Sequence, residues 1–247
     1  MLRALVWDVD GTLAETEHDG HRVAFNQAFA EAGLPWVWDA PLYRDLLSTT
    51  GGKERMARWW QQVDPAAAAA PDTAARIARL HVRKTAIYVD LVARGVVQLR
   101  PGVARLLHAA RADGVTLAIA TTTSPDNVQA LLQATLGADS PGWFACIGAG
   151  DVVPAKKPAP DIYRWVLQRL GLGAPDCLAL EDSAPGAAAA LAAGLPTVVT
   201  RSRYTVGDHL PPDPLMRADL ADLAAVDLAQ LRAWHAAEDR LPQHQAG

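Results

Sequence analysis

The stretch Ala4-Leu5-Val6-Trp7-Asp8-Val9-Asp10-Gly11-Thr12 decides the fold of this 247-residue chain. Four apolar residues stop at two carboxylates and a glycine, which is the pattern of a buried parallel strand that ends in a polar loop. Open α/β folds place ligands at the carboxyl ends of such strands. Carboxylates as close as Asp8 and Asp10 repel each other unless a divalent cation neutralises one and the other transfers protons. The opening strand therefore predicts a charged site at the edge of a sheet.

Composition excludes several classes of partner. Half of the residues are hydrophobic, the net charge is −4 and the pI is about 5.9, so we expect no nucleic-acid and no membrane partner. Acidic residues begin at position 8, before any apolar segment long enough for a signal peptide. Cys146 and Cys177 lie in apolar runs, where buried free thiols are expected. Together these features predict a cytoplasmic protein.

The pattern of elements changes twice along the chain. Helical patterns cover 21–32, 40–47, 53–63 and 72–93, with no strand between them. From about Val96 onward, helices alternate with short apolar strands, expected at 115–120, 143–147, 177–180 and 197–200. This alternation implies right-handed crossovers and a parallel sheet. The predicted fold class is therefore α/β, with a Rossmann-like core (1–14 and 95–247) split by a helical insertion (15–94). Beyond Arg201 we expect a packing helix and a frayed end.

Several elements of this fold end in polar groups that would converge on one edge of the sheet. The groups are Asp8, Asp10, Thr121, Lys157, Glu181 and Asp182. Adjacent parallel strands lie about 4.8 Å apart, so their ends share one small volume. Oxygen ligands in this number suit Mg²⁺, whereas a hydroxyl and a lysine suit phosphate oxygens. Asp8 can then attack phosphorus while Asp10 moves the proton, so the pattern predicts phosphoryl transfer.

These residues also carry a family resemblance. D-x-D-G-T, a strand-terminal threonine, K-P-x-P-D and E-D, in this order, resemble the four motifs of the haloacid dehalogenase superfamily, and the insertion resembles its small α-helical cap. The resemblance implies that Asp8 is the nucleophile and Asp10 the acid/base, and that Thr121 and Lys157 bind phosphate. It also implies that Mg²⁺ is held by Asp8, the Asp10 backbone carbonyl and Asp182, with Glu181 as a ligand or nearby acceptor.

The insertion contains a second candidate phosphate site. In Thr50-Gly51-Gly52-Lys53-Glu54-Arg55, paired glycines let backbone amides approach an anion where a helix begins. The expected substrate-binding residues are Gly51, Gly52, Lys53, Arg55, Glu17, His21, Thr122 and Ser124. Plain alternatives stay open at this point. The charges of Lys53 and Arg55 fit a solvated helix, Glu17 fits a surface residue, His21 a structural histidine and Ser124 a helix cap.

The resemblance extends to a subgroup. Residues 8–17 and 50–55 resemble the β-phosphoglucomutase-type group, and within it a bacterial and plastid subgroup associated with carbon fixation that hydrolyses xylulose 1,5-bisphosphate. It implies a Mg²⁺-dependent phosphatase that acts on a small phosphorylated sugar through an aspartyl-phosphate. The alternatives are a phosphomutase and a non-catalytic sugar-phosphate sensor. Thr12 favours hydrolysis, since related mutases often carry an apolar residue there. With no dimer-specific signal, we expect a monomer.

Overall fold

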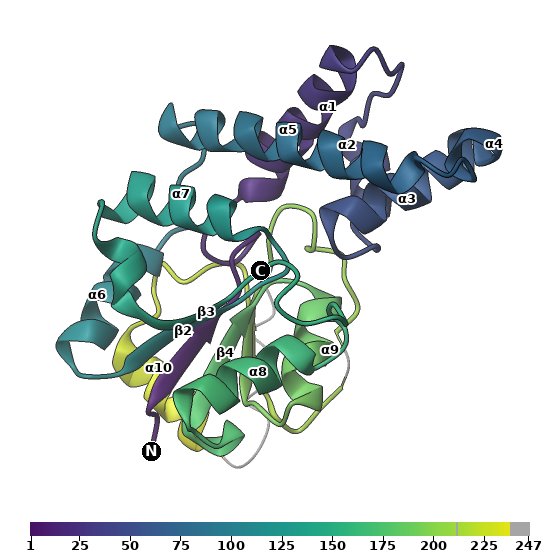
Figure 1. The fold of residues 1–247 in the computed structure, drawn as a ribbon. Helices are drawn as coiled ribbons and strands as arrows, with labels where there is room; N and C mark the ends of the chain where they lie inside the picture. The colour runs from purple at the N-terminus through teal and green to yellow at the C-terminus, as the bar shows by residue number, and fades with distance from the viewer. Residues whose placement is uncertain (211, 238–247) are drawn as a thin grey trace.

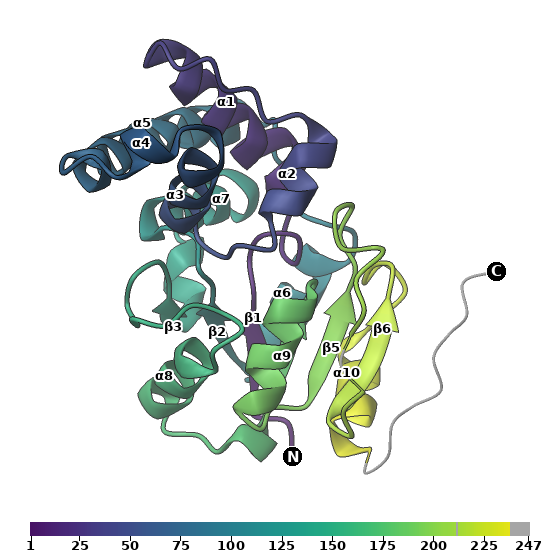
Figure 2. The ribbon, with the colours of Figure 1, turned by 90° about the vertical axis from the view of Figure 1, so that its right-hand side faces the viewer.

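A six-stranded parallel sheet, in the order β3-β2-β1-β4-β5-β6, forms the centre of the computed structural model, which describes residues 1–210 and 212–237 (Figures 1 and 2). The strands are β1 (Ala4–Trp7), β2 (Thr116–Ala120), β3 (Phe144–Gly148), β4 (Cys177–Glu181), β5 (Thr197–Thr200) and β6 (Met216–Leu220). Trp7 pairs with Ile119 on one side and with Leu180 on the other, so the three central strands end level with one another. This register confirms the predicted α/β class and aligns the polar residues that follow the strands.

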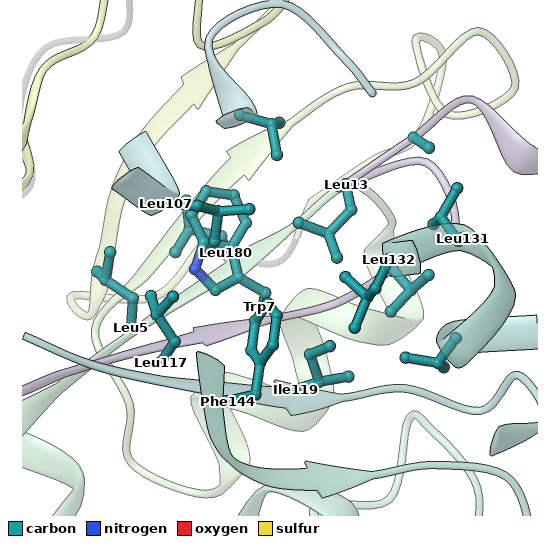
Figure 3. Close-up of a cluster of buried hydrophobic side chains, with 14 of the residues drawn as sticks. Leu5, Trp7, Leu13, Leu107, Leu117, Ile119, Leu131, Leu132, Phe144 and Leu180 are labelled. Carbon is teal, nitrogen blue, oxygen red and sulfur yellow. The ribbon is translucent and has the colours of Figure 1, made fainter. Parts of the chain in front are cut away.

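Helices cover both faces of the sheet. They are α6 (Val103–Ala112), α7 (Pro125–Leu136), α8 (Asp161–Leu170), α9 (Ala184–Ala192) and α10 (Leu228–Ala236), with the short 3₁₀ turns η2 (Ser140–Trp143) and η3 (Ala174–Asp176). Alternate β1 side chains enter different cores: Leu5 and Trp7 pack in the cluster drawn in Figure 3, and Ala4 and Val6 pack with α8 and α9. Because the central strands are buried on both faces, they read as nearly continuous apolar runs.

The insertion folds as a helical layer beyond the carboxyl ends of the strands (Figure 1). It contains the π-helical turn η1 (Glu17–His21) and the helices α1 (Arg22–Glu31), α2 (Ala40–Leu46), α3 (Gly52–Val63), α4 (Pro65–Ala68) and α5 (Thr73–Ala93). Its own core is aromatic: Phe25, Phe29, Trp36, Trp38 and Trp60 pack together. We call residues 15–94 the cap; the exact domain boundaries remain a prediction.

One buried arginine ties the cap connections to the sheet. Arg100 donates to the backbone oxygens of Thr200, Arg201 and Ala221, at 2.7 Å each, and to that of Gly11. Its own backbone amide donates to the oxygen of Leu13, next to a bridge between Ala14 and Leu99. Both crossings between cap and core therefore meet at one guanidinium.

The region after Arg201 differs from the sequence prediction. Residues 216–220 form a sixth, edge strand, whereas only a helix and a frayed end were expected there. The packing helix is confirmed as α10, and the predicted frayed end falls on 238–247, outside the described residues. Cys146 and Cys177 are buried free thiols as expected. In the described part of the chain, none of the helices combines the length and the apolar character needed to cross a membrane.

Candidate active site

The ends of β1, β2 and β4 bring the predicted core residues together. The amide of Asp8 donates to the oxygen of Leu180 at 2.9 Å, and the amide of Thr121 donates to the oxygen of Gly148 at 2.9 Å. These bonds continue the sheet ladder by one residue past each strand. Asp8, Thr121 and Glu181 are consequently all buried at the same edge.

Lys157 is the cation at the centre of this group. Its Nζ donates to Asp8 Oδ1 at 2.7 Å, to Glu181 Oε1 at 2.6 Å and to the backbone oxygen of Ala120 at 2.8 Å. Burial lowers the pKa of Lys157, but the carboxylates of Asp8 and Glu181 outweigh it and hold the ammonium charged. A fixed ammonium beside Asp8 is placed to neutralise charge on a phosphoryl group that reacts there.

Three carboxylates crowd around that single ammonium. Oxygens of Asp8, Glu181 and Asp182 lie within 4.8 Å of one another, and all three residues are buried. Burial raises the pKa of Asp8 to about 7, against the lowering effect of Lys157, and raises that of Asp182 well above its ordinary value. Glu181 Oε2 is buried and accepts no hydrogen bond in the described structure. A hard divalent cation such as Mg²⁺ would compensate the excess negative charge and would coordinate the unpaired oxygen. These oxygen donors therefore fit a Mg²⁺ site.

Two glycines give these carboxylates their space. A Cβ on Gly186 would lie 1.9 Å from Glu181 Oε2, and a Cβ on Gly11, where φ is +83°, would lie 2.1 Å from Asp182 Oδ2. The hydroxyl of Tyr163 also donates to Glu181 Oε1. The backbone at Gly11 and Gly186 therefore lies so close to the acidic cluster that a residue with a Cβ would collide with its carboxylates.

Asp10 lies in a different electrostatic environment from Asp8. Its Oδ1 accepts from Thr16 Oγ1 at 2.5 Å and lies 3.0 Å from His21 Nε2. On the other side of the ring, His21 Nδ1 lies 2.9 Å from the buried Nζ of Lys84. Burial would raise the pKa of Asp10, but His21, Thr16 and Lys84 outweigh it and lower that pKa to about 2. The surroundings of the two aspartates therefore act in opposite directions: burial favours the protonated form of Asp8, whereas His21, Thr16 and Lys84 favour the ionised form of Asp10.

Two neighbouring cavities lie between cap and core, and together they contain most of the predicted site residues. The first, of about 110 Å³, is lined by Asp10, Glu17, His21, Gly51, Gly52, Lys53, Arg55, Thr122 and Ser124. The second, of about 540 Å³, is lined by Asp8, Asp10, Glu17, Arg55, Thr122, Lys157 and Asp182. Thr121 and Glu181 line neither cavity and lie buried at the strand ends. The structure thus gathers the predicted core and cap residues around one cleft.

Several predicted cap residues bond to one another inside the cleft. The Tyr43 hydroxyl donates to Glu17, and Arg55 Nη1 donates to the Tyr43 hydroxyl at 2.9 Å. Arg55 is 6% exposed and its Nη2 lies 3.8 Å from Glu17 Oε1, so it is no solvated helix charge. Ser124 precedes α7 without a side-chain capping bond, and its buried Oγ has no partner in the described structure.

Sequence reasoning missed some residues of the cleft. Lys84, Lys156 and Asp151 line the first cavity and were given no role. Thr16 and Tyr163, which donate hydrogen bonds to Asp10 and Glu181 from outside the cavities, were not predicted either. One signal was available: the chain has only four lysines, and all four, Lys53, Lys84, Lys156 and Lys157, line the two cavities. In an arginine-rich chain, the position of each lysine was the useful clue.

Comparisons with known proteins agree with this geometry. Residues 2–194 match the family model of haloacid dehalogenase-like hydrolases. The plasmid-encoded protein CbbY of Cupriavidus necator is 50% identical over 247 residues, which cover 95% of this chain and 97% of that one. The crystal structure of CbbY from Rhodobacter sphaeroides in complex with phosphate is 45% identical, with a TM-score of 0.85 over 94% of this chain and all of that one. A variant of that protein in complex with xylulose 1,5-bisphosphate is 44% identical, also with a TM-score of 0.85, over 94% and 99% of the two chains. The chain therefore belongs to the haloacid dehalogenase-like hydrolases, as a phosphatase of the CbbY-like group.

Proposed function

We propose that this phosphatase is Mg²⁺-dependent and hydrolyses a sugar phosphate through a phosphorylated Asp8, with xylulose 1,5-bisphosphate as its substrate. The observation that carries the mechanism is the pairing of Lys157 Nζ with Asp8 Oδ1 at 2.7 Å, beside Asp10. The complex of the 44% identical CbbY with xylulose 1,5-bisphosphate supports the substrate.

The first half of the proposed reaction transfers phosphate to the protein. A carboxylate oxygen of Asp8 forms a bond to phosphorus while the bond from phosphorus to the sugar oxygen breaks. The leaving oxygen takes a proton held by the hydrogen-bonded pair of Asp10 and His21, whose atoms lie 3.0 Å apart. Thr121 and Lys157 hold the other phosphate oxygens in this step.

The second half uses Asp10 in its ionised form. Asp10 accepts a proton from water, the water oxygen attacks phosphorus, and the bond between phosphorus and Asp8 breaks to release phosphate. His21, Thr16 and Lys84 lower the pKa of Asp10 and so keep it ionised, which is the form that can accept this proton. Asp8, Asp182 and the Asp10 backbone carbonyl would hold Mg²⁺, with Glu181 nearby; when bound, the ion would offset the charge of the carboxylates and the phosphate.

The cap residues supply the proposed second phosphate site. Lys53, Gly51 and Gly52 line the smaller cavity together with Asp10, and the unpartnered Oγ of Ser124, a core residue, belongs to its lining as well. A bisphosphate with one phosphate at Asp8 could place its other phosphate there. We call this region the distal subsite, and it consists of Gly51, Gly52, Lys53, Ser124 and the neighbouring Lys156.

The decisive test is Asp8→Asn in the purified protein, with released phosphate as the measurement. We expect turnover of xylulose 1,5-bisphosphate to fall by about 10³-fold or more, with folding and ligand binding retained. The matched control is Asp126→Asn, an exposed aspartate in the first turn of α7. Phosphate release by Asp8→Asn at a rate close to that of the parent would refute covalent catalysis. An isomerised sugar phosphate in place of free phosphate would identify a mutase.

A further inference from the structure

Asp151 is a carboxylate shared by two lysines from opposite sides of the cleft. Lys53, in the first turn of cap helix α3, donates to Asp151 Oδ2 at 2.5 Å. Lys156, in the core loop after β3, donates to Asp151 Oδ1 at 2.6 Å. All three residues line the cavity that contains the distal subsite. A protein carboxylate therefore already occupies a position between two ammonium groups of the subsite.

The charges make this carboxylate a competitor for anionic ligands. Hydrogen bonds from Lys156 and Lys53 lower the pKa of Asp151 to about 2, so it is ionised at neutral pH. One negative charge faces two positive charges, which leaves the group cationic. A phosphate dianion would match both lysines better than a single carboxylate does, whereas a neutral hydroxyl end of a sugar would not displace it.

The two lysines are anchored differently. Lys156 also donates to the backbone oxygen of Gly150 at 2.6 Å, so the core keeps it in place. Lys53 bonds only to Asp151 among the described residues, and its side chain is 41% exposed. Exposed ion pairs of this kind contribute little free energy and exchange readily. Lys53 is consequently able to leave Asp151 for a ligand while Lys156 stays.

We propose that the carboxylate of Asp151 occupies the distal subsite in the absence of ligand and is displaced when a phosphate binds there. Asp151 would thereby set the affinity for sugar phosphates that carry a second, terminal phosphate. In the ligand-free enzyme it offsets part of the positive charge of Lys53 and Lys156. A terminal phosphate dianion displaces it, and its return to the lysines after hydrolysis weakens the hold on a product that still carries that phosphate. This inference rests on the proposed function, because it assumes that one phosphate lies at Asp8.

The test compares ligands with and without the terminal phosphate. In the Asp8→Asn background, which is not expected to turn substrate over, Asp151→Asn is titrated with xylulose 1,5-bisphosphate by calorimetry. It is also titrated with a sugar monophosphate that carries only the phosphate destined for Asp8. We expect the Kd of the bisphosphate to fall about tenfold and that of the monophosphate to change by about twofold at most. The matched control is Asp90→Asn, which removes the exposed partner of Arg94 on α5 with the same change of charge.

The opposite outcomes are distinct. A weaker Kd for the bisphosphate, or an equal shift for both ligands, would show that Asp151 builds the site or holds the cap closed, and the proposal would be wrong. Adding Lys53→Gln should abolish most of the effect of Asp151→Asn, since the two residues act on the same charge; additive effects would contradict the proposal. Failure of the Asp8→Asn protein to bind any sugar bisphosphate would instead refute the proposed function.

Discussion

Lys84 Nζ lies 2.9 Å from His21 Nδ1, and this contact connects cap helix α5 to the acid/base side of the site. The other nitrogen of the same ring lies 3.0 Å from Asp10 Oδ1. The imidazole is therefore held between a buried ammonium and a carboxylate, which fixes its orientation. Lys84 touches none of the groups proposed to react, and we expect it to act through His21 as a positioning residue.

Lys84→Met should lower kcat on xylulose 1,5-bisphosphate by about tenfold. Without Lys84 the His21 ring can turn away from Asp10, and the proposed proton transfer between the two becomes less efficient. The change in KM should be smaller. Steady-state kinetics on the purified variant provide the measurement, and Arg79→Met, an exposed position of the same helix, is the control. An unchanged kcat would mean that Lys84 has no part in positioning His21.

The same variant should be more stable than the parent at neutral pH. Burial lowers the pKa of Lys84 to about 8 from its ordinary value of 10.5, so the charged form destabilises the native state. The native protein binds fewer protons than the unfolded chain between these two values, and its stability rises with pH across that window. We expect Lys84→Met to gain about 1–3 kcal/mol below pH 8, and the gain to shrink between pH 8 and 10.5. Chemical denaturation at several pH values measures it; a loss of stability at pH 7 would contradict it.

Asp182→Asn should distinguish the stability that bound Mg²⁺ contributes from the stability of the metal-free fold. Without metal, burial and the neighbouring Asp8 and Glu181 raise the pKa of Asp182, which destabilises the native state at neutral pH; a neutral amide avoids this cost, so thermal stability should rise slightly. In the parent, Mg²⁺ at about 100 times its Kd should add about 2.7 kcal/mol of stability, and most of this gain should vanish in the variant. Melting curves with and without Mg²⁺ are the measurement, with Asp126→Asn as the control. An unchanged Mg²⁺ effect would exclude Asp182 as a ligand.

Gly186→Ala tests the close approach of backbone to the acidic cluster. The added methyl group would lie 1.9 Å from Glu181 Oε2, so the carboxylate must leave its place beside Lys157. We expect a loss of about 1–3 kcal/mol of stability and a fall in kcat of about tenfold or more. Gly142→Ala is the control, because a Cβ there meets nothing within 4 Å. Parent-like activity would show that the position of Glu181 is not critical.

Lys53→Ala should distinguish the two ends of the substrate. We expect KM for a sugar bisphosphate to rise about tenfold, and KM for a small monophosphate to change far less, because only the bisphosphate reaches the distal subsite. Lys53→Arg should restore most of the affinity. Equal effects on both substrates would remove Lys53 from the site.

The core of the site could be predicted because parallel strands impose it. Once residues 4–7 and 177–180 form adjacent parallel strands, Asp8 and Glu181 must lie at the same edge. The cap contacts are different, since Lys84 meets His21 across 63 residues and Lys53 meets Asp151 across 98. No local pattern encodes such pairs, because they depend on how the cap helices pack over the sheet.

The missed strand β6 has a related explanation. Its sequence, Met216-Arg217-Ala218-Asp219-Leu220, is short and carries charges, as edge strands often do. Part of its stabilisation comes from a residue outside the strand: Arg201 forms a bidentate ion pair with Asp219, at 2.7 and 2.8 Å. The sequence analysis recognised strands by their apolar runs. Residues 216–220 contain no such run, so β6 was not predicted.

The position of Arg100 has a consequence for how substrate enters. Its guanidinium bonds the first interdomain connection at Gly11 and the ends of β5 and β6, and Arg100 itself belongs to the second connection, so both connections are anchored to the sheet at one point. If cap and core separate to admit substrate, we expect the helical layer to rotate as a unit about this anchored point. Such a rotation would break polar contacts that join cap and core directly, such as the bond from Thr50 Oγ1 to the backbone oxygen of Lys157. Entry and release would thus be governed by a few exchangeable polar contacts at the rim, while the reacting carboxylates stay in register throughout the cycle.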